Sequence, residues 1–255
     1  MRVGGGGMPE SGIVFRPLVV SLGMTKPSKP LGELGRGETL PDHLPKSPLA
    51  IFRAWFDDAQ ERNLQPNPNA MTLATVDADG HPSARIVLCK AIHDDCLVFY
   101  TNYEGRKGRA LAANPRAAVV FHWDQFDRQV RIEGPVTRSP ASESDAYFHS
   151  RRWESRLGAW SSDQSEPIAS REALINKVRH TADALGVDMA AAVGGQPIEI
   201  DRPAHWGGFR LWFERVELWC GGIGRVHDRA GWTRTLKADG EGFRGGSWSG
   251  TRLQP

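Results

Sequence analysis

The stretch MTLATVDADGHPSARIVLCK, residues 71–90, joins two apolar segments through a short polar one. Residues 71–76 are rich in aliphatic and β-branched side chains, which favour a strand. Asp77-Ala78-Asp79-Gly80 is typical of a turn, because Asp and Gly tolerate the backbone conformations that turns require. Residues 83–90 predict a second strand, so the stretch indicates two strands with a tight connection.

The rest of the chain repeats this pattern. We expect further strands at residues 97–101, 117–123, 128–136, 209–219, 225–234 and 243–253, and helices that begin at Ser47-Pro48 and span 106–113, 139–151 and 170–185. Within 209–219 the apolar phase shifts between Phe213 and Val216, which predicts a bulge. Closely spaced strands with a few helices between them predict a mainly β fold with helical insertions (α+β), an antiparallel barrel.

Composition narrows the function classes. The 255 residues carry a formal net charge of +2, a much smaller excess of basic residues than a dedicated nucleic-acid binder has. The cysteines and histidines lack metal-ligand or redox spacing, so we assign no metal. No apolar run has the length of a membrane span and no secretory signal is recognisable, so we expect a cytoplasmic protein. Residues 1–45 are rich in Gly and Pro, which predicts a disordered extension before a single domain over residues 46–255.

Two short stretches carry basic residues that need a partner. Arg106, Lys107 and Arg109 fall at the start of the predicted helix 106–113, where the helix dipole disfavours cations unless an anion binds there. A phosphate is the natural anion, and a solvated basic helix start is the alternative. Arg85 and Lys90 lie on a mostly apolar strand, and their partners are either structural carboxylates or ligand phosphates.

A third cluster lies near residue 150. Tyr147, Arg151 and Ser155 are four residues apart, so they share one face if the helix continues through them. Together they would form a phosphate-binding cup, although a surface helix with a chance arginine has the same spacing. Gln129 and Gln164 lie among apolar neighbours, where each amide could bind the edge of a heterocycle or be satisfied by the backbone.

The segment from Trp219 to Arg229 reads WCGGIGRVHDR. If it is extended, Arg225, His227 and Arg229 share one face and favour an anionic or electron-rich group across them. A solvated charged hairpin is the alternative. No nucleophile–base pair accompanies these clusters, so the pattern indicates a protein that binds two phosphorylated small molecules, with a cofactor supplying the reactivity.

Short motifs connect these clusters in order along the chain: 85–90 (RIVLCK), 99–102 (FYTN), 106–107 (RK), 114–116 (NPR), 128–130 (RQV), 147–151 (YFHSR), 158–160 (GAW), 164–165 (QS), 206–210 (WGGFR) and 219–229. From about residue 48 onwards the chain resembles the pyridoxine/pyridoxamine 5′-phosphate oxidase family. The resemblance implies an FMN-binding split β-barrel, a homodimer with shared active sites. It also implies phosphorylated B6 vitamers as substrates, with O2 as electron acceptor and H2O2 as product.

The same resemblance implies roles for individual residues. The FMN phosphate would bind Arg85, Arg106 and Lys107, and further flavin contacts would come from Tyr100, Thr101, Gln129, Gln164, Ser165, Trp219 and Arg229. The substrate phosphate would bind Lys90, Tyr147, Arg151 and Ser155, while the catalytic residues Arg225 and His227 would cover the substrate ring.

The chain also departs from that family. It lacks an Arg-x-x-Tyr segment before Ser47, Arg152 stands where proline usually follows His-Ser-Arg, and the segments 186–204 and 239–250 look long. A flavin oxidase of the phenazine-biosynthesis type is one alternative, but that branch lacks the Tyr147/Arg151 pair. A non-catalytic flavin or B6-phosphate binder is another, and it would be expected to lose Arg225 or His227.

Overall fold

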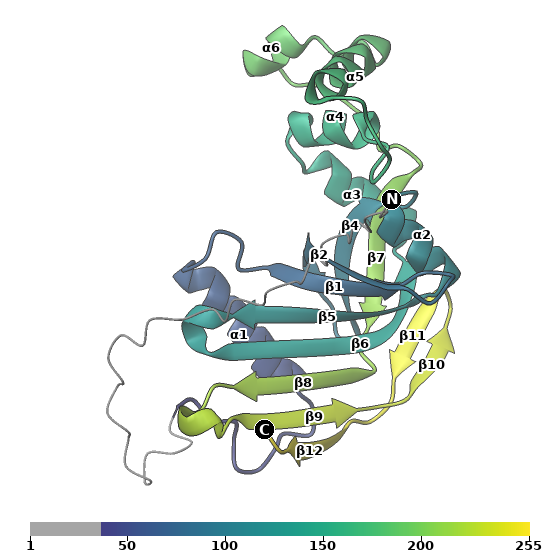
Figure 1. Ribbon diagram of the computed structural model, residues 1–255. Coiled ribbons are helices and arrows are strands. Elements are labelled where there is room, and N and C mark those ends of the chain that lie inside the picture. Colours follow the sequence, from purple (N-terminus) through teal and green to yellow (C-terminus); the bar gives the residue numbers. More distant parts are fainter. Residues whose placement is uncertain (1–36) are drawn as a thin grey trace, which may run out of the picture. The chain divides into compact units, whose positions relative to one another are not determined.

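The computed structural model describes residues 37–255. Ten strands form one antiparallel sheet in the order β12-β9-β8-β6-β5-β1-β2, and β7, β4 and β3 join it through β6 (Figure 1). The strands are β1 (Ala70–Val76), β2 (Pro82–Leu88), β3 (Ala91–Ile92), β4 (Cys96–Asn102), β5 (Arg116–Trp123), β6 (Arg128–Arg138), β7 (Trp206–Trp212), β8 (Arg215–Cys220), β9 (Asp228–Thr233) and β12 (Ser249–Leu253), with a separate hairpin of β10 (Leu236–Asp239) and β11 (Gly242–Gly245). The predicted mainly β fold is confirmed.

Helices interrupt the strands at several points. They are α1 (Leu49–Arg62), α2 (Arg106–Ala113), α3 (Ala141–His149), α4 (Trp153–Ser161), α5 (Arg171–Ala184) and α6 (Met189–Val193), with short 3-10 turns η2 (Asp124–Phe126) and η3 (Ile223–Arg225). None of the helices between residues 37 and 255 has the length and apolarity needed to cross a membrane.

The opening hairpin has the predicted geometry. Strands β1 and β2 pair antiparallel from Ala70 opposite Leu88 to Val76 opposite Pro82. The Asp77 carboxylate accepts the backbone N–H groups of Asp79 and His81, which closes the turn. Gly80 has a φ of +85°, a left-handed conformation that glycine adopts without strain.

Two apolar clusters hold the domain together. The larger lies between the curled sheet and α1, where Phe52 packs against Phe121 and Phe213 with ring centroids 5.4 and 6.3 Å apart. The smaller joins α3–α6 to the start of β7 and includes Phe148 and Trp206. Figure 1 shows these helices gathered beyond β4 and β7. The second cluster therefore fixes α3 and α4 against one end of the sheet.

The predicted bulge is present, but the strand that carries it is divided. On β6, Val136 pairs with Leu211 and Glu133 pairs with Arg215. Four residue steps on one side therefore lie opposite three on the other, so one extra residue is accommodated where β7 gives way to β8. Gly134 permits this crossing, because a Cβ there would lie 1.8 Å from the carbonyl oxygen of Trp212. The predicted strand 243–253 is likewise two strands, β11 and β12, with Gly246–Trp248 between them.

The predicted extension over residues 1–45 falls mainly outside the described residues. Its last part, residues 37–45, contacts the sheet: Leu40 is buried and its N–H donates to Asp228 at 2.7 Å. Trp232 Nε1 donates to the carbonyl of Pro45 at 3.0 Å. The contacts of the domain therefore begin before residue 46.

Candidate active site

A cavity of about 540 Å³ opens where β2 and β4 meet the helices α2, α3 and α4. Nine of the site residues expected from the sequence line it: Arg85, Lys90, Tyr100, Thr101, Lys107, Tyr147, Arg151, Ser155 and Gln164. Apolar side chains of β2 and the residues Arg152 and Trp206 complete the lining. No Asp or Glu is among the described residues that line this cavity, although four of its residues carry a basic side chain that the sequence predicts to bind phosphate.

One end of the cavity gathers Arg85 and Lys107. Within residues 37–255, the groups that accept from Arg85 are all neutral: the Leu73 carbonyl at 3.1 Å, the Thr75 hydroxyl at 2.8 Å and the Ser83 hydroxyl. Lys107 Nζ donates to Thr101 Oγ1 at 3.1 Å and to Gln164 Oε1. Burial, followed by repulsion from Arg85, lowers the pKa of Lys107 to about 8. The two cations are thus held near each other without a compensating carboxylate.

The first residue of α2, Arg106, belongs to the same charged group. Burial and then the charge of Arg106 lower the pKa of Arg85. The Arg106 N–H donates to the hydroxyl of Ser165 at 3.3 Å, and Ser165 has a φ of +76°. A non-glycine residue in this region is strained, and such strain is most often found at functional sites. The helix start therefore carries the cations that the sequence predicted, and Ser165 lies against it.

Gly105 explains how Gln164 reaches Lys107. A Cβ at position 105 would lie 2.7 Å from Gln164 Oε1 and 3.2 Å from its Cβ. Only glycine lets the amide side chain approach the start of α2 this closely. The amide is therefore oriented by Thr101 and Lys107 at the cavity wall.

The second end of the cavity lies between α3 and α4. The helix does not continue from Tyr147 to Ser155, so the condition for one shared helical face is not met: α3 ends at His149 and α4 begins at Trp153. Tyr147, Arg151 and Ser155 nevertheless line one cavity on either side of this break. The Arg151 N–H donates to the Phe148 carbonyl at 3.2 Å within this break.

The Arg151 guanidinium lacks an anionic partner. Its Nη1 is buried and bonds no group of the described residues, and burial lowers the pKa of this side chain. Lys90 Nζ lies 5.9 Å from the centre of the Tyr147 ring. A buried guanidinium with an unused donor is costly unless a ligand accepts from it. Both ends of the cavity therefore fit phosphate groups, as a flavin phosphate and a phosphorylated substrate would require.

The remaining candidates lie on a different part of the sheet. Gln129 on β6 stands opposite Trp219 on β8, which stands opposite Arg229 on β9, so the three form one row across the strands. His227 joins this row, with its ring centroid 4.6 Å from that of Trp219. None of these residues lines the cavity. Within one chain, the structure therefore separates the candidates into two groups.

The segment before β9 is not extended, so Arg225, His227 and Arg229 do not form a continuous strand face. Arg225 ends η3 with a φ of +63° and is exposed, and β9 begins only at Asp228. Gly222 causes the compact turn, since a Cβ there would lie 1.9 Å from the Val226 carbonyl oxygen. The Gly222 N–H donates to His227 Nδ1 at 3.1 Å, which orients the imidazole.

Arg229 already has protein partners. Its guanidinium donates to Glu217 at 2.8 and 3.1 Å and to the Gln254 carbonyl at 2.9 Å. Glu217 also accepts from Arg131 at 3.1 Å. The positive charge of Arg229, one of the three basic candidates in the segment 225–229, is thus partly neutralised by the Glu217 carboxylate of β8.

Sequence reasoning missed two residues of the cavity. Trp206 was recognised only as part of a family motif, and its place in the lining depends on the long-range pairing of β7 with β4. Arg152 was noted as a departure from the family, and its side chain is mainly exposed and paired with Glu154. Neither role could be found from spacing, because the segments that meet here lie about 50 residues apart in the chain.

Comparisons with known proteins agree with this geometry. A family model described as pyridoxamine 5′-phosphate oxidase matches residues 56–183, and one described as the pyridoxine 5′-phosphate oxidase C-terminal dimerisation region matches residues 206–255. Pyridoxine/pyridoxamine 5′-phosphate oxidase of Cupriavidus necator is 46% identical over 228 residues, covering 88% of this chain and 94% of that protein. The protein of the same name from Bordetella avium is 49% identical over 220 residues, covering 86% and 95%.

Solved structures give the same answer for the fold. PhzG from Burkholderia lata 383, in complex with tetrahydrophenazine-1-carboxylic acid, aligns with a TM-score of 0.70 at 26% identity, covering 87% of this chain and 100% of that one. A pyridoxamine 5′-phosphate oxidase-related, FMN-binding protein from Nostoc punctiforme aligns with a TM-score of 0.59 at 17% identity, covering 83% and 100%. The chain therefore belongs to the pyridoxine/pyridoxamine 5′-phosphate oxidase family of FMN-dependent oxidoreductases.

Proposed function

We propose that this protein oxidises pyridoxine 5′-phosphate, pyridoxamine 5′-phosphate or both to pyridoxal 5′-phosphate, with O2 as acceptor and H2O2 as product. The observation that carries the proposal is one cavity with two separate cationic ends and no carboxylate in its described lining. Two phosphorylated molecules, cofactor and substrate, would neutralise these ends.

The Arg85 end would hold the phosphate of FMN. Arg85, Arg106 and Lys107 supply the charge, while Thr101 and Gln164 keep Lys107 aimed at the cavity. Ser165 would add a contact beside the start of α2. When bound, FMN would supply the two-electron acceptor for the hydride that leaves C4′ of the substrate, and O2 would be the final acceptor.

The Arg151 end would hold the substrate phosphate. The buried Arg151 Nη1 is an unused donor, and Lys90, Tyr147 and Ser155 line the same end. Tyr100 stacks on Tyr147 with ring centroids 4.0 Å apart, so a predicted flavin contact packs directly on a predicted substrate contact in the cavity lining. Anchoring both phosphates would set the distance between the reacting atoms, and direct hydride transfer depends mainly on that geometry.

The second group of residues would complete the site from the partner subunit. Arg225 and His227 lie apart from the cavity of their own chain, within the region that matches the family's dimerisation model. His227 Nδ1 accepts the Gly222 N–H, so the neutral imidazole keeps its proton on Nε2 and can donate it to a ligand. The exposed Arg225 would stabilise negative charge on the substrate ring. Gln129, Trp219 and Arg229 would contact the flavin from the same side.

An oxidase of the PhzG type is the second candidate, favoured by the structural match at a TM-score of 0.70. The Tyr147/Arg151 pair favours a phosphorylated substrate instead. To test both, the FMN-loaded protein is mixed without oxygen with each B6 phosphate in turn. Flavin bleaching that reverses in air, with pyridoxal 5′-phosphate formed, supports the proposal. A flavin that stays oxidised with both substrates contradicts it.

A further inference from the structure

Trp206 contacts the residue that the proposed function places on the substrate phosphate. The Arg151 Cζ atom lies 4.6 Å from the centre of the Trp206 ring, closer than its 5.6 Å from the Phe148 ring. A guanidinium over an indole face is attracted by the ring's electrons, most strongly where water is excluded. Trp206 is buried, and it lines the cavity.

The surrounding contacts leave Arg151 dependent on this indole. None of the ion pairs found among residues 37–255 includes Arg151, and its Nη1 has no hydrogen-bond partner there. The nearby Arg156 repels it. Among the described residues, the Trp206 ring is therefore the nearer of the two aromatic faces that contact the charged group.

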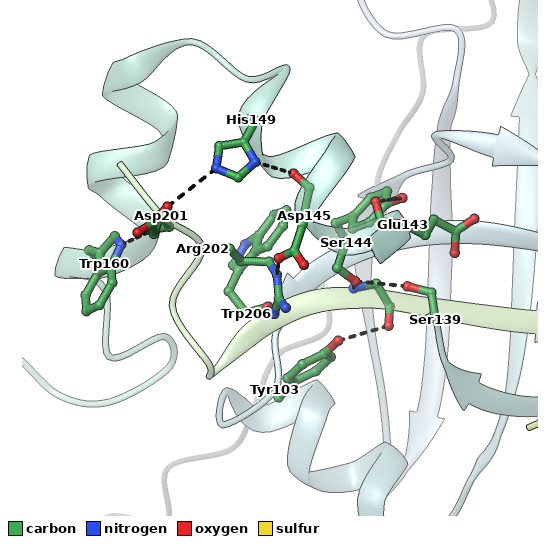
Figure 2. A network of polar contacts seen from close by, with 12 residues as sticks. Tyr103, Ser139, Glu143, Ser144, Asp145, His149, Trp160, Asp201, Arg202 and Trp206 are labelled. Atoms are coloured by element: carbon green, nitrogen blue, oxygen red, sulfur yellow. Dashed lines mark hydrogen bonds and ion pairs between the residues drawn. The ribbon is translucent and has the colours of Figure 1, made fainter. Parts of the chain in front are cut away.

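Trp206 is itself held firmly from both sides. Its ring lies nearly parallel to those of Tyr100 and Tyr147, with interplanar angles of 10° and 9°, and edge-on to Phe148. Its carbonyl accepts from Arg202 Nη1 at 2.7 Å, and Arg202 Nε donates to Asp145 on α3 at 2.6 Å. Figure 2 shows Arg202 between Asp145 and Trp206. Arg202 thus ties the first residue of β7 to the middle of α3, the helix that ends two residues before Arg151.

We infer that Trp206 is a positioning residue for the substrate phosphate, because its indole holds the Arg151 guanidinium in the cavity. The inference rests on the proposed function for the identity of the substrate. It predicts that loss of the indole weakens phosphate binding mainly through Arg151, with Tyr147 as the other neighbour affected, and leaves Arg85 and Lys107 in place to bind FMN.

The test compares Trp206→Leu, which removes the aromatic face, with Trp206→Phe, which keeps a weaker one. We expect KM for the phosphorylated substrate to rise about fivefold in the first and about twofold in the second, with kcat and the Kd for FMN unchanged. Trp160→Leu is the matched control, because Trp160 lies on α4, donates to the Asp201 carbonyl and does not line the cavity.

A double-mutant cycle separates positioning from general damage. In an Arg151→Ala background, Trp206→Leu should change KM by less than about 1.5-fold. An undiminished effect in that background, or a loss of FMN binding in Trp206→Phe, would overturn the inference.

Equilibrium dialysis with pyridoxal 5′-phosphate and with inorganic phosphate measures how much each variant weakens ligand binding relative to the wild type, without turnover. Wild-type protein that binds these probes in a Trp206-dependent way but oxidises no B6 phosphate would contradict the proposed function alone. Active protein whose Trp206→Leu variant binds them as tightly as the wild type would contradict this inference alone.

Discussion

The pH dependence of FMN affinity should report on Lys107. Burial and the neighbouring Arg85 lower the pKa of Lys107 to about 8 before a ligand binds. A phosphate next to the ammonium raises that pKa, so FMN binding takes up a proton above pH 8. The contribution of Lys107 to affinity is therefore complete below pH 8 and is lost as the pH rises through that value. The phosphate itself stays doubly charged above pH 7, since its second pKa is about 6.

The size of the effect follows from the fraction of charged Lys107. With a pKa of about 8, this fraction falls from about nine-tenths at pH 7 to about one-tenth at pH 9, so the Kd for FMN should rise about tenfold. Flavin fluorescence quenching measures the Kd of the apoprotein at each pH. Lys107→Arg should abolish the inflection, because arginine stays charged throughout, and Lys107→Met should bind weakly at every pH. A wild-type Kd that is flat from pH 7 to 9, or a Lys107→Met variant with the wild-type slope, would refute the reasoning.

Three further outcomes are expected. Arg151→Ala should raise KM for the B6 phosphates roughly 10- to 100-fold, since a hydrogen bond to a charged group contributes about 1.5–3 kcal/mol; an unchanged KM in steady-state assays would remove Arg151 from the phosphate site. Arg225→Ala should lower kcat about tenfold or more while FMN is retained, and a purified variant whose only defect is lost flavin would contradict its catalytic role. Mixing the impaired Lys107→Met and Arg225→Ala chains should raise activity to about a quarter of the wild-type value, because half of the dimers are mixed and each has one intact shared site; activity no higher than the mean of the two separate variants after subunit exchange would argue against sharing.

The sequence predicted where helices and strands form better than it predicted where they are interrupted. The helix 106–113 and the hairpin 71–90 depend on nearby residues, and both were confirmed. Spacing alone could not show that α3 stops at His149, because the break is stabilised by packing of Phe148 against Trp206, far along the chain. The compact turn at Gly222 was missed for a similar reason: periodicity does not report how closely Gly222 approaches Val226.

The candidate site shows the same division. Basic residues at a predicted helix start, on an apolar strand and on one predicted helix face were interpreted as possible anion ligands, and nine of the predicted residues do line one cavity. The separation of Arg225 and His227 from that cavity could not be deduced from residue types, because it depends on the order of strands in the sheet. Trp206 carried no charge signal at all, so its contact with Arg151 emerged only from the three-dimensional structure.

The contacts between residues 37–45 and the last strand have a consequence for sequence variation. Arg252 on β12 forms an ion pair with Asp228 and donates to the carbonyl oxygens of Leu40 and Pro41. The first contact depends on a side chain, so we expect positions 228 and 252 to covary among relatives. The other two depend on the backbone alone, so Arg252 places no constraint on which amino acids stand at positions 40 and 41. The two carbonyl contacts can thus persist while the side chains at positions 40 and 41 change, and it is the burial of Leu40 that restricts which residue stands at position 40.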